Sequence, residues 1–106
     1  MADSDNRSSV KEIAMEYGKL VMEKVDIKHI YLYGSYAKGT NSPDSDIDIA
    51  VVGDGFSGDP VEDTLMLMKI RRKIDTRIEP RPFKTSDFNL SNPFAREIIN
   101  TGIKIT

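Results

Sequence analysis

Hydrophobic residues recur at helical spacing in three parts of this chain. Over residues 9–25 an apolar residue returns every three or four positions, the period of a helix that packs on one side. Ser9 heads a capping-box pattern, so this helix is expected to begin there. A second helix is predicted over residues 60–72, where proline follows aspartate at the first helical position. A third, short helix is expected over residues 91–102.

Four other segments have the composition of strands. They are short, rich in β-branched and aromatic residues, and bounded by turn-forming residues. Pro80 and Pro82 are expected to end the third strand, because proline lacks the N–H group that a strand donates. The expected strands cover residues 28–34, 46–52, 74–79 and 103–105.

The order of these elements predicts an α/β (α+β) fold. Each helix has one apolar stripe, so we expect a small mixed sheet with helices mainly on one face. A chain of 106 residues is long enough for one hydrophobic core, which predicts a single domain over residues 1–106. The polar residues 1–8 are expected to be disordered.

The composition limits the classes of protein to which the chain can belong. It has no cysteine and no apolar run long enough for a signal peptide or a membrane span, so a cytoplasmic protein without membrane contact is expected. The net charge is −2: residues 1–69 carry 7 Lys and Arg against 13 Asp and Glu, and residues 70–106 carry 8 against 4. Such a chain is a poor candidate for nonspecific nucleic-acid binding.

Two aspartates stand at the start of the strand predicted over residues 46–52. Because side chains alternate along a strand, Asp46 and Asp48 should point to one face, while Ile47 and Ile49 point to the other. Two carboxylates this close raise each other's pKa unless a cation lies between them. Only oxygen ligands are offered here, and these favour Mg²⁺.

A second polar feature lies where the first predicted strand ends. Ser35 to Lys38 can form one helical turn closed by Gly39, with free N–H groups that would face an anion. Gly34 would let phosphate oxygens approach the backbone, and the Ser35 hydroxyl adds a donor. Lys38 either neutralises phosphate charge or is simply solvated. Together with the aspartates, this turn predicts a site for a metal-bound nucleotide.

Other interpretations of the same segment fail on position. An EF-hand loop beginning at Asp44 would need glycine at its sixth position, where Ile49 stands. A P-loop beginning at Gly34 would need lysine where Thr40 stands. A simple polar turn accounts for Asp44 but does not explain the aspartate at position 48, inside the strand.

These residues resemble a known family. Gly34-Ser35, ten residues and Asp46-Ile47-Asp48 match the GS-x10-DxD signature of the polymerase beta type nucleotidyltransferases, and the segment is similar to the minimal nucleotidyltransferase (MNT) domain. The similarity extends over about residues 9–80. It implies a nucleoside triphosphate held at the Gly-Ser turn, two Mg²⁺ ions on three carboxylates, and displacement of pyrophosphate.

The resemblance implies that the third carboxylate comes from the strand after the second helix. Asp75 is the first choice as ligand or base beside the two aspartates, and Glu79 is the alternative. Strand register decides between them, because the third oxygen must lie beside Asp48. Arg77, on the same predicted strand, is a better candidate than Arg81 for touching phosphate.

The function implied by the resemblance is transfer of a nucleoside monophosphate, AMP from ATP, to an acceptor hydroxyl. The chain has little room for an acceptor domain, so the acceptor is expected on a partner protein. MNT antitoxins are paired with helical HEPN toxins and add AMP to them, and this chain resembles such an antitoxin. The alternatives are a non-catalytic binding module and a nucleotidyltransferase that modifies small molecules such as antibiotics. Homo-oligomer formation is left open.

Overall fold

The structure is a computed structural model that describes residues 6–106, and the side chains from residue 9 onward. Its elements are α1 Asn6–Met22, β1 Ile27–Tyr33, α2 Ser35–Lys38, β2 Ile47–Gly53, α3 Pro60–Arg71, β3 Ile78–Lys84, the 3-10 turn η2 Thr85–Asp87, α4 Pro93–Thr101 and β4 Ile103–Lys104.

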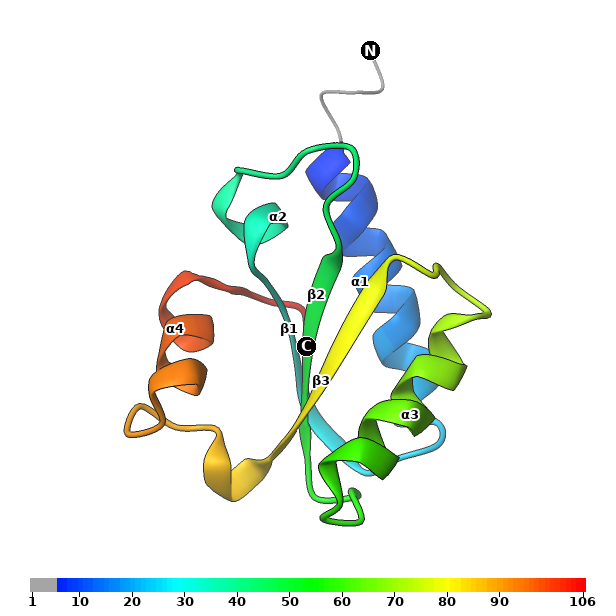
Figure 1. Ribbon diagram of the computed structural model, residues 1–106, viewed down its shortest axis with the longest axis vertical. Coiled ribbons are helices and arrows are strands. Elements are labelled where there is room, and N and C mark those ends of the chain that lie inside the picture. Colours follow the sequence, from blue (N-terminus) through cyan, green and yellow to red (C-terminus); the bar gives the residue numbers. More distant parts are fainter. Residues whose placement is uncertain (1–5) are drawn as a thin grey trace.

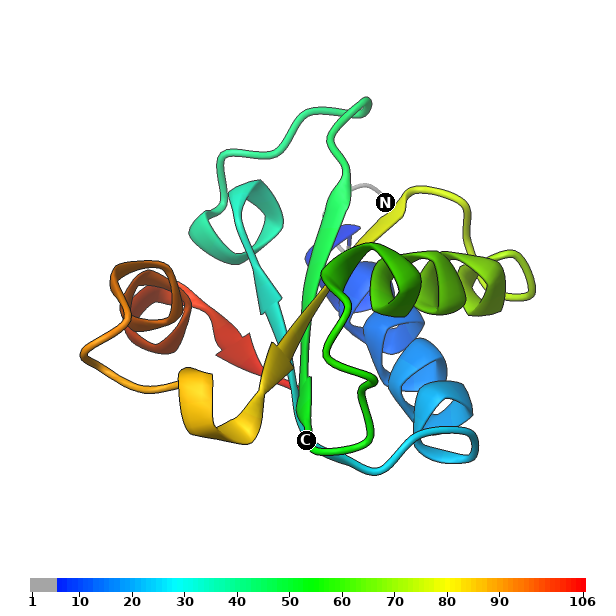
Figure 2. The ribbon, with the colours of Figure 1, turned by 60° about the horizontal axis from the view of Figure 1, so that its bottom comes forward.

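The four strands form one mixed sheet in the order β3-β2-β1-β4 (Figure 1). β1 is antiparallel to both β2 and β4, whereas β2 and β3 run parallel. α1 and α3 lie side by side on one face of the sheet, and α4 lies on the other (Figure 2). The predicted α/β fold, with a mixed sheet and helices mainly on one face, is confirmed.

Side chains that alternate along β2 enter two separate hydrophobic clusters. Ile47, Ile49 and Val51 are fully buried and pack with residues of α1 and α3. Ala50 and Val52 point the other way and pack with buried residues of β3 and α4. A slip of one residue would exchange the two sets, so burial on both faces holds β2 in a single register. Asp48 therefore has a defined position on the α4 face.

Several predicted elements are present with shifted ends. α1 begins at Asn6, so Ser9 lies inside the helix instead of capping it, and the helix ends at Met22. Residues 6–8, predicted to be disordered, are part of α1, and the same prediction for residues 1–5 lies outside the described part of the chain. α3 begins at Pro60 as predicted, because the Asp59 carboxylate accepts hydrogen bonds from the first-turn amides.

The third strand lies further along the chain than predicted. Residues 74–77 form a turn, and β3 begins at Ile78 and continues through Pro80 and Pro82. The predicted strand over residues 74–79, ended by the prolines, is therefore wrong. β3 is an edge strand, and the Arg77 carbonyl faces β2, where it accepts from the Ile47 amide at 2.9 Å. Alternation then directs the missing N–H groups of both prolines to the open edge, where no partner needs them.

No helix within residues 6–106 combines the length and the apolar character needed to cross a membrane.

Candidate functional site

The site begins at the corner between β1 and α2. Gly34 ends the strand with φ of 77°, a left-handed conformation that favours glycine, and α2 starts at the next residue. The single helical turn over Ser35–Lys38 closes at Gly39, as predicted. A Cβ atom on Gly34 would collide with Oδ2 of Asp48. Position 34 therefore favours glycine for two reasons: the positive φ angle, and the lack of room for a Cβ atom beside the Asp48 carboxylate.

Asp48 faces a second carboxylate across the sheet. Its partner in the parallel register between β2 and β3 is Glu79, and its partner on β1 is Tyr33. Burial raises the pKa of Asp48 above its ordinary value, and the negative charges of Asp46 and Glu79 raise it further. Asp46 lies one residue before β2 begins. The structure thus brings Asp46, Asp48 and Glu79 into one electrostatic group beside Gly34.

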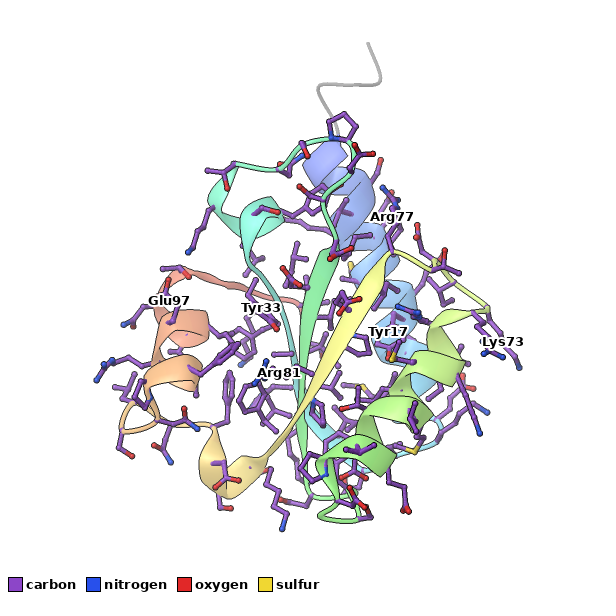
Figure 3. The ribbon with its side chains drawn as sticks, viewed as in Figure 1. Tyr17, Tyr33, Lys73, Arg77, Arg81 and Glu97 are labelled. Atoms are coloured by element: carbon purple, nitrogen blue, oxygen red, sulfur yellow. The ribbon has the colours of Figure 1, made fainter. Side chains whose placement is uncertain are left out.

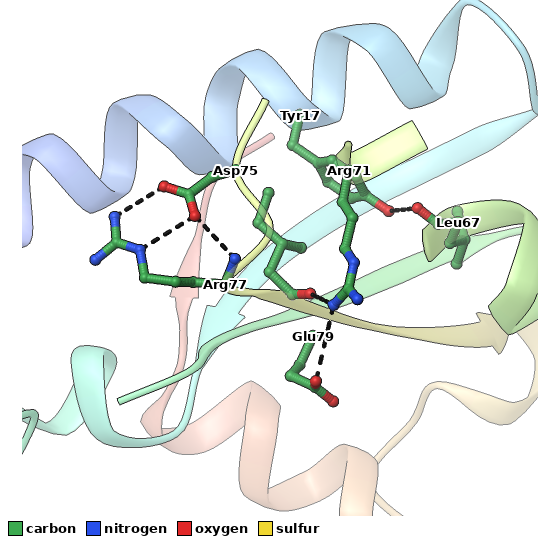
Figure 4. A network of polar contacts seen from close by, with 7 residues as sticks. Tyr17, Leu67, Arg71, Asp75, Arg77 and Glu79 are labelled. Carbon is green, nitrogen blue, oxygen red and sulfur yellow. Dashed lines mark hydrogen bonds and ion pairs between the residues drawn. The ribbon is translucent and has the colours of Figure 1, made fainter. Parts of the chain in front are cut away.

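Asp75 has a different environment. It lies in the turn before β3, where its carboxylate accepts three hydrogen bonds from Arg77: from the backbone N at 2.8 Å, from Nε at 3.1 Å and from Nη2 at 2.8 Å (Figure 4). Hydrogen bonds from the Arg77 side chain, more than any other influence, lower the pKa of Asp75. Register places Glu79, and not Asp75, beside Asp48. The charged groups of Asp75 and Arg77 are therefore paired with each other.

Glu79 also lies near the side chain of Arg71. Nη1 of Arg71, at the end of α3, donates to the Ile78 carbonyl at 2.7 Å and lies 3.9 Å from Oε2 of Glu79 (Figure 4). The contact to Glu79 is long, and the Glu79 side chain is about half exposed, so this ion pair is weak. Its carboxylate remains accessible to a ligand.

An open groove of about 490 Å³ runs beside these carboxylates. Tyr33, Asp48, Glu79 and Arg81 line it from the sheet, and Pro60, Thr64, Pro80 and Pro82 complete the lining from α3 and β3. Burial, followed by the charge of Asp48, raises the pKa of Tyr33 to about 12. The sequence favoured Arg77 over Arg81 as the arginine that touches phosphate, whereas Arg81, and not Arg77, lines the groove. A correct prediction of β3 would have shown this, because Glu79 and Arg81 are two residues apart and share one face of the strand.

Lys38, at the end of α2, is paired with a side chain of α4. Its Nζ forms an ion pair of 3.0 Å with Oε2 of Glu97 on α4, and both side chains are about half exposed. Figure 3 shows Glu97 on α4, the helix on the opposite side of the sheet from α1. The structure therefore does not bring the predicted phosphate-binding lysine to the carboxylates.

The donor set of the site has the chemistry of a site for a hard divalent cation. Carboxylate oxygens are the ligands that Mg²⁺ prefers, and a cation would relieve the like-charge repulsion that raises the pKa of Asp48. Among residues 6–106, no three His, Cys, Asp or Glu side chains are arranged to hold a metal ion as they stand. The residues fit such an ion by chemistry and would have to converge on it.

Comparison with known families gives a match over most of the chain. Residues 15–106 match the model of the family described as "Polymerase beta, Nucleotidyltransferase". One relative from Methanocaldococcus jannaschii, named "Putative protein adenylyltransferase", is 37% identical over 67 residues, which is 63% of this chain and 67% of the relative. A second protein of that name and organism is 38% identical over 78 residues, 72% of this chain and 75% of the relative.

Solved structures share the fold. A crystal structure titled as a "putative nucleotidyltransferase" from Sulfolobus solfataricus has a TM-score of 0.71 at 19% identity, over 98% of this chain and 86% of the other. A crystal structure titled as a "toxin-antitoxin with AMP-PNP" has a TM-score of 0.61 at 23% identity, over 95% of this chain and 73% of the other. At these identities the likeness establishes the fold alone.

Proposed function

Since the chain belongs to the polymerase beta nucleotidyltransferase family and is a nucleotidyltransferase, we propose that it transfers AMP from ATP to a hydroxyl group on a partner protein. The observation that carries this proposal is the position of Asp48, opposite Glu79 and against the Gly34 corner. A phosphate-binding backbone turn beside grouped carboxylates is the arrangement that metal-assisted phosphoryl transfer needs.

Each part of the site has a role in this reaction. The free amides of the Gly34-Ser35 turn and the Ser35 hydroxyl hold phosphate oxygens of ATP. Asp46, Asp48 and Glu79 would hold Mg²⁺, which supplies charge neutralisation on the phosphates when bound. We choose Glu79 over Asp75 as the third carboxylate, because Asp75 already accepts three hydrogen bonds from Arg77.

The bond changes in this reaction are those of a simple displacement. The acceptor oxygen forms a bond to the α-phosphorus, and the bond from that phosphorus to the bridging oxygen of pyrophosphate breaks. The acceptor proton passes to a site carboxylate or to solvent, and pyrophosphate leaves. Ionised Asp48 is the reactive form, since only the carboxylate can share a cation with its neighbours.

The acceptor we propose is a toxin of the helical HEPN type, with this chain as its antitoxin. Two kinds of relative support this choice: proteins named as protein adenylyltransferases, and a toxin-antitoxin complex that shares the fold. The groove beside Asp48 and Glu79 is open, which gives a protein segment access to it. A HEPN-type acceptor would place one hydroxyl, most simply a tyrosine, at the α-phosphate.

The test is transfer of label from α-labelled ATP with Mg²⁺ to the purified product of the neighbouring gene. We expect labelling of that protein by the wild type and a roughly 100- to 1,000-fold lower rate of labelling by Asp48→Asn. Mass spectrometry should then locate AMP on a single hydroxyl. Failure to label any protein acceptor, together with labelling of free small-molecule acceptors, would replace this proposal with the small-molecule alternative.

A non-catalytic binding module is the second candidate. It is favoured by one observation, that no three ligand side chains within residues 6–106 are arranged for a metal ion as they stand. This candidate expects Asp48→Asn to neutralise the partner as well as the wild type does, without ATP. A growth assay of the partner's toxicity distinguishes the two.

A further inference from the structure

ATP brings several negative charges to a site that is already acidic. Asp46, Asp48 and Glu79 form its carboxylate group, so the phosphates need cationic side chains in addition to a bound metal ion. Two of the cations considered from the sequence are committed elsewhere. Lys38 is paired with Glu97 at 3.0 Å, and Arg77 is paired with Asp75 at 2.8 Å.

Arg81 is in a different position. Among the described residues that line the groove beside Asp48, it is the one with a positive charge. It lies two residues after Glu79 on β3, so both side chains point to the same face of the sheet. No carboxylate within the described side chains forms an ion pair with it, and it is exposed to solvent. Its charge is therefore available to a ligand.

The guanidinium group of Arg81 is also held in place. Its Cζ lies 4.1 Å from the centre of the Phe94 ring, and its positive charge acts on the neighbouring Tyr33, where it lowers the pKa against the larger effect of burial. The rings of Tyr33 and Phe94 contact each other edge to face, with centroids 6.0 Å apart. Figure 3 shows Tyr33 and Arg81 together between α4 and the sheet, with Arg77 well separated at the start of β3. A guanidinium group is planar by itself, and its contact with the Phe94 ring limits the directions in which its N–H groups can point.

We propose that Arg81, held by Phe94 and Tyr33, binds a phosphate group of the nucleoside triphosphate. The inference rests on the proposed function in that the ligand is a nucleotide, but it concerns binding and not transfer. A guanidinium group suits this role, because its planar fork can donate two parallel hydrogen bonds to phosphate oxygens. Phe94 and Tyr33 act as positioning residues, since they reduce the freedom that Arg81 would otherwise lose on binding.

The experiment measures binding of two probes in the presence of Mg²⁺: ATP, by titration calorimetry, and inorganic tripolyphosphate, by its competition with ATP. We expect Arg81→Ala to weaken both by a similar factor of roughly 10- to 100-fold, the range for losing charged hydrogen bonds. Arg81→Lys should recover part of the affinity, because it keeps the charge without the fork. Phe94→Leu should produce a smaller loss than Arg81→Ala.

Arg96→Ala is the matched control, because Arg96 is an exposed arginine on α4 that does not line the groove. It should bind both probes as the wild type does, and thermal melting should show all variants folded. Unchanged ATP affinity in Arg81→Ala would overturn the proposal. So would a loss for ATP without a loss for tripolyphosphate, which would assign Arg81 to the nucleoside. A wild type that binds ATP but labels no protein would contradict the proposed acceptor and leave the role of Arg81 standing.

Discussion

Two acidic regions of this molecule, 27 positions apart along the chain, have opposite electrostatic states. Asp75 accepts hydrogen bonds from the backbone and side chain of Arg77, and its pKa is lowered. Asp48 is partly buried among other carboxylates, and its pKa is raised. The first carboxylate is stabilised in its charged form by its neighbours, whereas the second is destabilised.

The difference separates a structural acid from a functional one. A carboxylate that is already satisfied has little to gain from binding a cation, and its interactions help to hold the turn before β3. A carboxylate kept among like charges gains from any cation that arrives. Shifted pKa values that have no structural compensation are typical of active sites. On this ground, and because the strand register places Glu79 opposite Asp48, we propose the Asp48 region as the site and expect the Asp75 region to support the strand that carries Glu79.

The largest expected effect is that of Asp48→Asn. Label transfer should fall by roughly 100- to 1,000-fold, as when one preorganised electrostatic group is removed from a reacting centre. Because asparagine carries no charge, the variant should melt at a temperature equal to or above that of the wild type at neutral pH. Transfer assays and thermal melts check both parts. Full activity in Asp48→Asn would remove this region from the catalytic site.

A direct comparison of Glu79→Gln with Asp75→Asn tests the choice of the third carboxylate. Glu79→Gln should reduce transfer by roughly 10- to 100-fold through a weaker metal site. Asp75→Asn should leave transfer close to the wild-type level. The reverse order of effects would restore Asp75 as the third carboxylate, and Mg²⁺ titration of each variant would show which one shifts the metal requirement.

Asp75→Asn should affect stability instead. Its carboxylate is largely buried while the Arg77 side chain is about half exposed, so solvent screening reduces the pair to about 1 kcal/mol of unfolding free energy. Urea unfolding at neutral pH measures this loss. Arg77→Met removes the two side-chain hydrogen bonds and keeps the one from the backbone N–H, so it should give a similar or smaller decrease. The double variant should be less destabilised than the sum of the two.

The smallest effects concern pH. The pKa of Asp75 is lowered in the folded state, so its contribution is present above its unfolded pKa and is lost as the pH falls through the folded value. The difference in stability between wild type and Asp75→Asn should therefore shrink in acid. The pKa of Asp48 is raised, so wild-type stability relative to Asp48→Asn should instead decline as the pH rises through the interval between its unfolded and folded values. Urea titrations at several pH values distinguish the two slopes.

Much of the site is readable from the chain because its signals are local. The left-handed glycine, the helical turn after it and the side-chain alternation of β2 depend on residues within a few positions of one another. The same holds for α3, where the Asp59 cap is followed directly by Pro60. Local geometry therefore determined the corner at Gly34 and the direction of Asp48 within β2.

The third carboxylate and the cation of the groove depended on the tertiary structure. Whether Asp75 or Glu79 lies opposite Asp48 is a question of register between strands joined through α3, and no short-range pattern encodes that register. The prolines in β3 were misleading because a strand tolerates them only at an open edge, and strand order decides where the edges are. The position of Arg81 at the groove depends on the same placement of β3, because Arg81 lies two residues after Glu79 on that strand. The sequence by itself determined two neighbouring aspartates and the glycine turn at Gly34, because both depend on local geometry. Only the packing of β3 against β2 decided that Glu79 and Arg81 lie beside them.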